Sequence, residues 1–221
     1  MKTFKELQEG VYDPNIFKAI FLAGGPGSGK SYVTKKITGG LGLKTINSDP
    51  HFEKLIKGAG LSLNMPDDEL DSREPLRIRA GNLRDKQKAN YLEGRLGIII
   101  DSTASDADKL ISQSNGLMEL GYDTYMIFVN TSVDVALKRN AERSRSVPEP
   151  IVVNAWKAVQ NNIGRFSQHF TRGHFIVVDN NDANEDELAK VQKIIRRLVK
   201  KKVTNTRAKN WVSMELAKKR R

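Results

Sequence analysis

Short apolar, β-branched runs alternate along the chain with amphipathic segments. The strand-like runs are residues 18–23, 43–48, 96–101, 122–129 and 175–179. The helix-like segments are residues 30–38, 73–93, 105–120, 132–144, 149–167 and 184–201. This alternation predicts an α/β fold, with a doubly wound, mainly five-stranded parallel sheet.

Polar helix-start signals precede two of these helices. Ser105 or Asp106 can cap the helix at 105–120, and Thr131 or Ser132 can cap the next one. In parallel sheets, ligands bind beyond the carboxyl ends of the strands. The first four predicted strands end at or just before four polar or glycine residues, namely Gly24, Asp49, Asp101 and Asn130. We therefore predict the site at that edge of the sheet.

A glycine-rich segment directly follows the first apolar run. It reads Gly24, Gly25, Pro26, Gly27, Ser28, Gly29, Lys30, Ser31. This fits G-x-x-x-x-G-K-[ST], a loop whose backbone N–H groups surround the phosphates of a nucleoside triphosphate. Lys30 is expected to reach the β- and γ-phosphates and Ser31 to bind Mg²⁺, so ATP and Mg²⁺ are the predicted cofactors. The alternative is an ordinary glycine-rich turn.

Two carboxylates at predicted strand ends are candidates for the chemistry. Asp49 is the proposed general base, which would accept the hydroxyl proton during phosphoryl transfer, although an N-cap role is the alternative. Asp101 closes the run Ile-Ile-Ile-Asp, as in a Walker B element, and is the second predicted Mg²⁺ residue. The same strand end could instead simply cap the next helix.

Arginines after the fourth strand are candidates for a lid. Arg139 and Arg143 are four residues apart and therefore share a helical face. Guanidinium groups there would hold the triphosphate and neutralise charge that develops during transfer. A solvated basic face is the alternative, and the sequence does not decide whether Arg145 belongs to the lid.

The positive charge is concentrated near the C-terminus. Of the net charge of +11, the segment 196–221 contributes +10, which leaves residues 1–195 almost neutral. A segment of this kind is typical of a nucleic-acid contact, with a solvated end as the alternative. Arg73, Arg77, Arg84 and Lys88 form a second basic stripe on the predicted helix 73–93, whose buried side would carry Leu76, Ala80 and Leu83. The chain has no cysteine, which excludes disulfides and a thiol nucleophile, and no apolar run long enough to span a bilayer.

The order of these motifs resembles the kinase domain of phage polynucleotide kinases and the wider zeta-toxin group of P-loop kinases. The resemblance rests on the glycine-rich loop, Asn-x-Asp after the second strand, Ile-Ile-Ile-Asp at the third, and Lys-Arg-Asn-x-x-Arg followed by Val-Pro. It covers residues 18–180. It implies phosphate-binding roles for Lys30 and Ser31, the base role for Asp49, and triphosphate contacts for Arg139 and Arg143.

One position departs from this pattern. Polynucleotide kinases carry an acceptor-binding arginine three residues after the base, where this chain has Phe52. We expect transfer to a hydroxyl of a nucleic acid, either a 5′-OH or a hydroxymethylated base. A zeta-like kinase of a small molecule or sugar nucleotide is one alternative, and a nucleotide-dependent nucleic-acid-binding virion protein is another.

The N-terminus resembles the capsid-targeting leaders of tailed phages, with Leu7, Gln8 and Glu9 before Gly10 as a candidate cleavage site. A small helix packed on the core is the alternative. The expected organisation is a leader at 1–15, a kinase domain at 16–202 and a basic tail at 203–221. The expected location is the host cytoplasm, or the virion if the leader acts in packaging.

Overall fold

The computed structural model describes residues 10–63, 66–143, 147–171, 173–182 and 184–219. The candidate leader and cleavage site at 1–9, and Arg145, lie outside these residues. The strands are β1 (Lys18–Ala23), β2 (Lys44–Ile46), β3 (Ile98–Asp101), β4 (Asp123–Asn130) and β5 (Phe175–Asp179). All four pairings between them are parallel, and the strand order is β2-β3-β1-β4-β5. The predicted five-stranded parallel sheet is confirmed.

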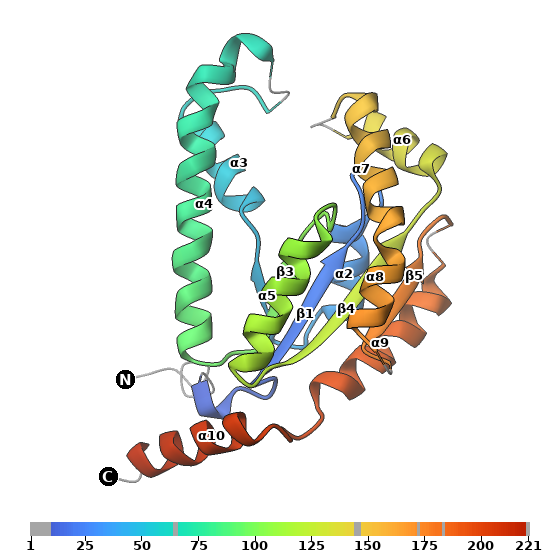
Figure 1. The fold of residues 1–221 in the computed structure, drawn as a ribbon. Helices are drawn as coiled ribbons and strands as arrows, with labels where there is room; N and C mark the ends of the chain where they lie inside the picture. The colour runs from blue at the N-terminus through green and yellow to red at the C-terminus, as the bar shows by residue number, and fades with distance from the viewer. Residues whose placement is uncertain (1–9, 64–65, 144–146, 172, 183, 220–221) are drawn as a thin grey trace.

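Helices lie on both faces of this sheet and above its carboxyl edge (Figure 1). They are α2 (Lys30–Thr38), α3 (Asp49–Gly58), α4 (Leu70–Glu93), α5 (Ala107–Glu119), α6 (Val133–Ala141), α7 (Glu149–Asn161), α8 (Ile163–His169), α9 (Glu185–Val199) and α10 (Thr206–Lys219), with 3₁₀ turns η1 (Gly10–Tyr12) and η2 (Asp67–Glu69). Two of the predicted caps form: Asp106 accepts from the Lys109 N–H at 3.0 Å, and Ser132 accepts from the Val135 N–H at 3.3 Å.

The alternation of side chains along β1 divides the core into two layers. Phe21 faces a cluster that includes residues of α5, α8 and α10, whereas Ile20 and Leu22 face a cluster formed with α2 and α9. This two-sided burial explains why β1 reads as a continuous apolar run rather than an alternating one. No helix in the described part of the chain is long and apolar enough to cross a membrane.

Two helical arms rise beyond the carboxyl ends of the strands (Figure 1). One consists of α3 and α4, which pack through a small apolar cluster containing Phe52, Ile56 and Ala80. The other consists of α6 and α7. The triphosphate-loop candidate lies at the base between them.

The predicted helix 149–167 is two helices, and this boundary is a correction. Asn162 lies at the break, and its side-chain amide donates to the carbonyls of Ala104 and Ser105 at 3.2 and 2.9 Å. The amide therefore links the end of α7 to the loop after β3. The hydrophobic periodicity of the sequence cannot predict this contact, because Asn162 and the carbonyl groups that it contacts are far apart along the chain.

The four residues of the basic stripe on α4 lie in different environments. Arg73 is buried, the Arg77 guanidinium lies 4.9 Å from the centre of the Phe52 ring, and Arg84 pairs with Asp85 at 2.9 Å. Lys88 is half-buried, and burial lowers its pKa. On the predicted buried side, Ala80 is buried but Leu83 is exposed.

The predicted tail is packed on the core. Trp211 of α10 makes an edge-on contact with Phe17, with ring centroids 5.5 Å apart, and Ala208 is fully buried. Gly121 approaches Ala208 so closely that a Cβ on the glycine would lie 3.0 Å from the backbone nitrogen of Ala208. Residues 203–219 thus close the end of the sheet opposite the two arms.

Candidate active site

The glycine-rich loop connects β1 to α2 and is shaped by contacts that leave no room for side chains. Gly27 has φ +77°, and a Cβ there would lie 2.0 Å from the Ala136 carbonyl oxygen of α6. Gly29 has φ +80°, and its Cβ would meet the side-chain amide of Asn180 at 2.4 Å. Glycine is required at both positions by conformation and by space together.

Asn180, just beyond β5, holds this loop from behind. Its buried side chain donates to the Ser28 carbonyl at 2.8 Å. The Ser28 hydroxyl is itself buried and has no hydrogen-bond partner among the described residues. The positive φ angles of Gly27 and Gly29 curl the loop at the N-terminus of α2, and backbone N–H groups in such a loop bind phosphate oxygens, so the residues present suit a nucleoside triphosphate.

Lys30 is the cation at the centre of the site. Its ammonium donates to the Gly24 carbonyl at 2.6 Å. Burial lowers the pKa of Lys30, the nearby Asp101 and Asp49 carboxylates oppose this shift, and Arg143 adds to it. Lys30 therefore lies between the acidic and the basic groups of the site.

Asn47 links the two acidic residues. Its side-chain amide donates to the Asp101 carboxylate at 2.9 Å, and its side-chain oxygen accepts from the Asp49 backbone N–H at 2.8 Å. Asp49 is the first residue of α3, and Ser48 occupies the N-cap position without a side-chain cap bond. The alternative N-cap role of Asp49 is therefore not what the geometry shows.

Asp101 ends β3 beside β1 and is partly buried. Burial raises the pKa of its carboxyl group, with Asp49 adding to the rise and Lys30 opposing it. Ser31 and Asp101 offer oxygen ligands, which suit Mg²⁺. Among the described residues, no group of three or more histidine, cysteine or acidic side chains is placed to hold a metal ion.

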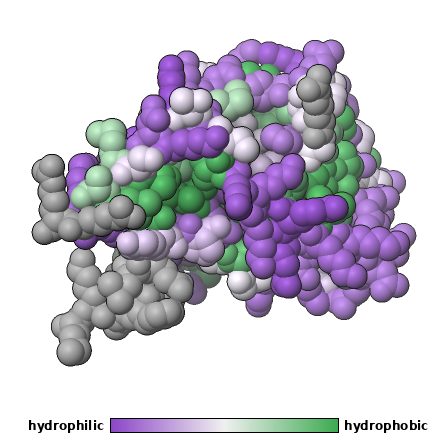
Figure 2. All heavy atoms as spheres, turned by 90° about the horizontal axis from the view of Figure 1, so that it is seen from below, coloured by the Kyte–Doolittle hydropathy of each residue, from purple (hydrophilic) through white to green (hydrophobic). Residues whose placement is uncertain are grey.

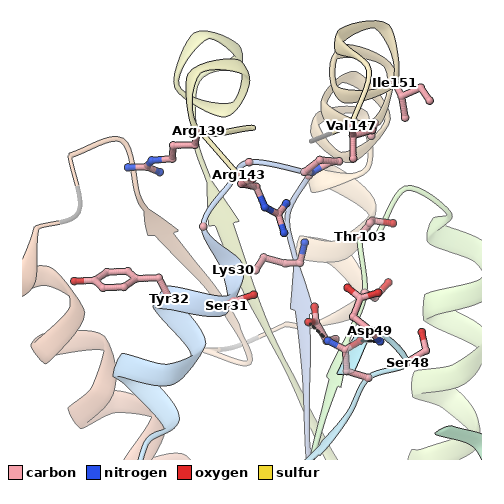
Figure 3. A pocket seen from close by; sticks show the side chains of 18 residues that line it. Lys30, Ser31, Tyr32, Ser48, Asp49, Thr103, Arg139, Arg143, Val147 and Ile151 are labelled. Carbon is pink, nitrogen blue, oxygen red and sulfur yellow. Dashed lines mark hydrogen bonds between the residues drawn. The ribbon is translucent and has the colours of Figure 1, made fainter. Parts of the chain in front are cut away.

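The two lid arginines occupy different places. Arg139 donates to the carbonyls of Asn180 and Asn181 at 2.6 and 3.0 Å, so its guanidinium is held on the β5–α9 loop. Figure 3 shows Arg139 directed sideways, while Arg143 extends toward Lys30. Of the pair, Arg143 is the better placed for the triphosphate.

Asn140 shapes the turn that carries Arg143. Its buried amide donates to the Val147 carbonyl at 2.7 Å, and its oxygen accepts from the Val147 N–H at 3.0 Å. The two bonds close the loop between α6 and α7 on itself. This contact gives a structural reason for the Lys-Arg-Asn and Val-Pro pair in the sequence.

These groups line a cavity of about 690 Å³ between the two arms. Its phosphate side contains the glycine-rich loop, Lys30, Ser31, Arg139 and Arg143. Across the cavity, Asp49 lies with Ser48 and Thr103, below Ile151 of α7 (Figure 3). The lining also includes Tyr32, Asn47, Asp101, Ser102, Val147 and Ala155.

A parallel sheet of this order, with a glycine-rich phosphate loop and an arginine-bearing lid, defines a kinase-like P-loop fold. The chain belongs to the Zeta toxin family, whose profile matches residues 11–187. No curated protein matches the chain.

Solved structures show the same fold at low sequence identity. A candidate kinase from Chloroflexus aurantiacus has 18% identity and a TM-score of 0.55, covering 83% of this chain and 97% of that one. The complex of AvrRxo1-ORF1 and AvrRxo1-ORF2 with sulphate ions has 16% identity and a TM-score of 0.57, covering 75% and 55%. The Pnkp1/Rnl/Hen1 RNA repair complex has 20% identity and a TM-score of 0.52, covering 68% and 46%.

The cavity lining includes every predicted site residue except Ser28, a residue of the glycine-rich loop whose side chain is buried. Sequence reasoning gave no role to Asn47, Asn140 or Asn180. A signal for Asn47 was present in the Asn-x-Asp spacing, and one for Asn180 in its position at the end of the fifth strand. Asn140 could not be found in this way, because its partner is known only once the lid loop is folded.

Proposed function

We propose that this protein is an ATP- and Mg²⁺-dependent kinase that transfers the γ-phosphate to an alcohol. The observation that carries the proposal is the convergence of Lys30 and Arg143 with Asp49 and Asp101 on one cavity. Cations on one side and a carboxylate on the other are what in-line phosphoryl transfer requires.

In this mechanism Asp49 accepts the proton of the acceptor hydroxyl. The acceptor oxygen bonds to the γ-phosphorus as the bond to the β–γ bridging oxygen breaks, and ADP leaves. Lys30 and the loop N–H groups hold the phosphates, while Arg143 offsets negative charge that develops on them. Ser31 and Asp101 would hold Mg²⁺, which supplies further neutralisation of phosphate charge.

We propose a small-molecule alcohol as the acceptor. The acceptor side of the cavity has hydroxyl groups from Ser48 and Thr103 and an apolar wall at Ile151, and no cation among the described lining residues. Binding of a nucleic-acid strand depends on contacts between cations and phosphates. Phe52 stands where polynucleotide kinases carry an acceptor-binding arginine, and it cannot bind a phosphate in that way, because its apolar side chain is buried between α3 and α4.

A nucleic-acid hydroxyl is the second candidate. The motif order shared with polynucleotide kinases favours it, as does the basic charge near the C-terminus. Kinase activity itself is common to both candidates, so only the acceptor separates them.

The test is transfer of label from γ-labelled ATP to a panel of acceptors: 5′-hydroxyl DNA and RNA, hydroxymethyl-base DNA, and uridine-diphosphate amino sugars. Lys30→Ala is the blank. We expect Asp49→Asn to bind ATP almost normally and to lose about 10²–10⁴-fold in transfer, the range for a positioned base. Normal transfer by Asp49→Asn would refute the base assignment, and label in nucleic acid alone would reverse the order of the two acceptors.

A further inference from the structure

Basic side chains are concentrated where α9 ends and α10 begins. We call this group the basic face; its members are Arg196, Arg197, Lys200, Lys201, Lys202, Arg207 and Lys209. All seven are exposed. Figure 2 views the molecule from this end and shows hydrophilic residues over most of its right-hand half, the side on which Figure 1 places α9.

These charges are largely unused by the fold. Among the described residues, none of the seven takes part in an ion pair, and Arg207 alone makes a side-chain hydrogen bond, to the Glu119 carbonyl at 2.7 Å. The acidic residue of α10, Glu215, pairs instead with Lys218 at 2.6 Å. The positive charge of the basic face is therefore available to a ligand in solvent.

The basic face lies at the opposite end of the sheet from the catalytic cavity. Trp211 of α10 packs on Phe17, which directly precedes β1, whereas the phosphate loop directly follows β1. The six residues of β1 span about 20 Å at about 3.3 Å per residue. A polyanion bound along α9 and α10 would therefore not be placed at Asp49 by the same contacts.

We propose that the basic face binds the phosphate backbone of nucleic acid as an anchor that is separate from the acceptor site. Lys200, Lys201 and Lys202 are consecutive and exposed at the end of α9, so three positive charges lie close together along the chain, as contact with neighbouring phosphates requires. Binding through lysine and arginine without a base-reading element is independent of sequence.

A nucleic acid fits this face better than a lipid surface. Peripheral helices bind membranes by burying an apolar side in the interface. The apolar side of α10 is already used, because Ala208, Trp211 and Val212 pack on the core. The interaction that remains for the basic face is electrostatic attraction to phosphates, without insertion of an apolar side into a membrane.

The experiment compares full-length wild type with Lys200→Gln/Lys201→Gln/Lys202→Gln. The matched control is Lys54→Gln/Lys57→Gln/Lys86→Gln, which removes the same charge from exposed positions on the α3–α4 arm. Binding of fluorescein-labelled duplex and single-stranded DNA is measured by anisotropy over a range of KCl. ATP binding and phosphate transfer are measured in parallel on the same three proteins.

We expect wild type and the control to bind DNA with a strong salt dependence. The test variant should bind at least about tenfold more weakly, and the slope of log K against log [salt] should fall by about one for each lysine that contacts phosphate. ATP binding and transfer should be unchanged in both variants.

Equal DNA binding by wild type and the test variant would overturn the proposal, as would a loss confined to the α3–α4 control. Binding to phosphatidylserine vesicles without binding to DNA would also overturn it and would identify a membrane surface instead. Failure of the kinase proposal would appear separately, as absent transfer with intact DNA binding.

Discussion

At the scale of single residues, Asp101 is a carboxylate whose surroundings favour its neutral form. Burial raises its pKa, and the neighbouring Asp49 adds to the rise. Function as a Mg²⁺ ligand requires the charged form. Asp101 is thus placed where its charge costs stability, and ionisable groups with shifted pKa values of this kind are common at active sites.

Asp101→Asn should raise the free energy of unfolding at neutral pH. A raised folded-state pKa means that the charged carboxyl destabilises the fold once the pH exceeds that of normal carboxyl titration. The difference between variant and wild type should therefore be largest at neutral pH, shrink as the pH falls through the raised pKa of Asp101, and disappear below the ordinary carboxyl pKa. Denaturant unfolding at several pH values, without nucleotide, measures this.

The same variant should lose Mg²⁺-dependent transfer by about 10²–10³-fold, the range for removal of one positioned electrostatic group. A control is Asp108→Asn, an exposed carboxyl that pairs with Arg165. An Asp101→Asn protein that is no more stable than wild type at neutral pH would contradict the assigned environment.

At the scale of elements, the turn between α6 and α7 explains how the short motif Lys-Arg-Asn followed by Val-Pro positions Arg143. The two hydrogen bonds between Asn140 and Val147 fix the ends of the turn, and Arg143 lies within it. Arg139, one residue before Asn140, is held by the β5–α9 loop. The two arginines that the sequence pattern places on one helical face therefore lie in different places, because α6 ends at Ala141, before Arg143.

Asn140→Ala should weaken ATP binding by about tenfold and destabilise the protein by about 1–3 kcal/mol. The reason is that two buried hydrogen bonds are lost and the Val147 backbone groups are left without partners. ATP affinity by titration calorimetry and KM for ATP are the measurements. Lys138→Ala, an exposed substitution on the same helix, is the control and should leave both unchanged; unaltered ATP affinity in Asn140→Ala would show that the turn does not position Arg143.

At the scale of the whole molecule, α10 closes the sheet at the end opposite the active site. Trp211 contacts Phe17 and lies about 5.9 Å from the Arg95 guanidinium, while Phe17 also contacts Tyr122 at 5.4 Å. These contacts join the segments that precede β1, β3 and β4. The basic C-terminal segment is thus part of the core as well as a charged surface.

Trp211→Ala should destabilise the protein by about 2–3 kcal/mol. Removal of a fully buried tryptophan costs about 3–5 kcal/mol, and the loss is smaller here because Trp211 is partly exposed. Thermal and denaturant unfolding measure the loss, and Lys209→Ala on the exposed side of α10 should be neutral. For the same reason, deletion of 203–221 would expose Phe17, so it cannot test nucleic-acid binding in isolation. A Trp211→Ala protein as stable as wild type would mean that α10 contributes little to the core.

Much of the site could be predicted from the sequence because its signals are local. The glycine-rich loop is a continuous stretch whose backbone conformation depends on its own residues, so Lys30 and Ser31 follow from the motif. Asp49 and Asp101 follow from the rule that parallel strands end at one edge, and that rule needs only the order of strands. The prediction of the five-stranded sheet, which the structure confirms, rests on local hydrophobic periodicity in the same way.

The tertiary structure decided the features that depend on contacts between distant segments. Three examples are the burial of Arg73, the stacking of Arg77 on Phe52 and the packing of α10 on Phe17. Each arises where packed elements meet, and the hydrophobic periodicity of the sequence does not predict which elements meet. The same holds for the separation of Arg139 from Arg143. The sequence by itself determined which candidate phosphate-binding groups lie at the carboxyl edge of the sheet, because the loop motif and the strand ends are local features. Three-dimensional packing decided which charges remain available for ligands, because burial and pairing depend on neighbours in space.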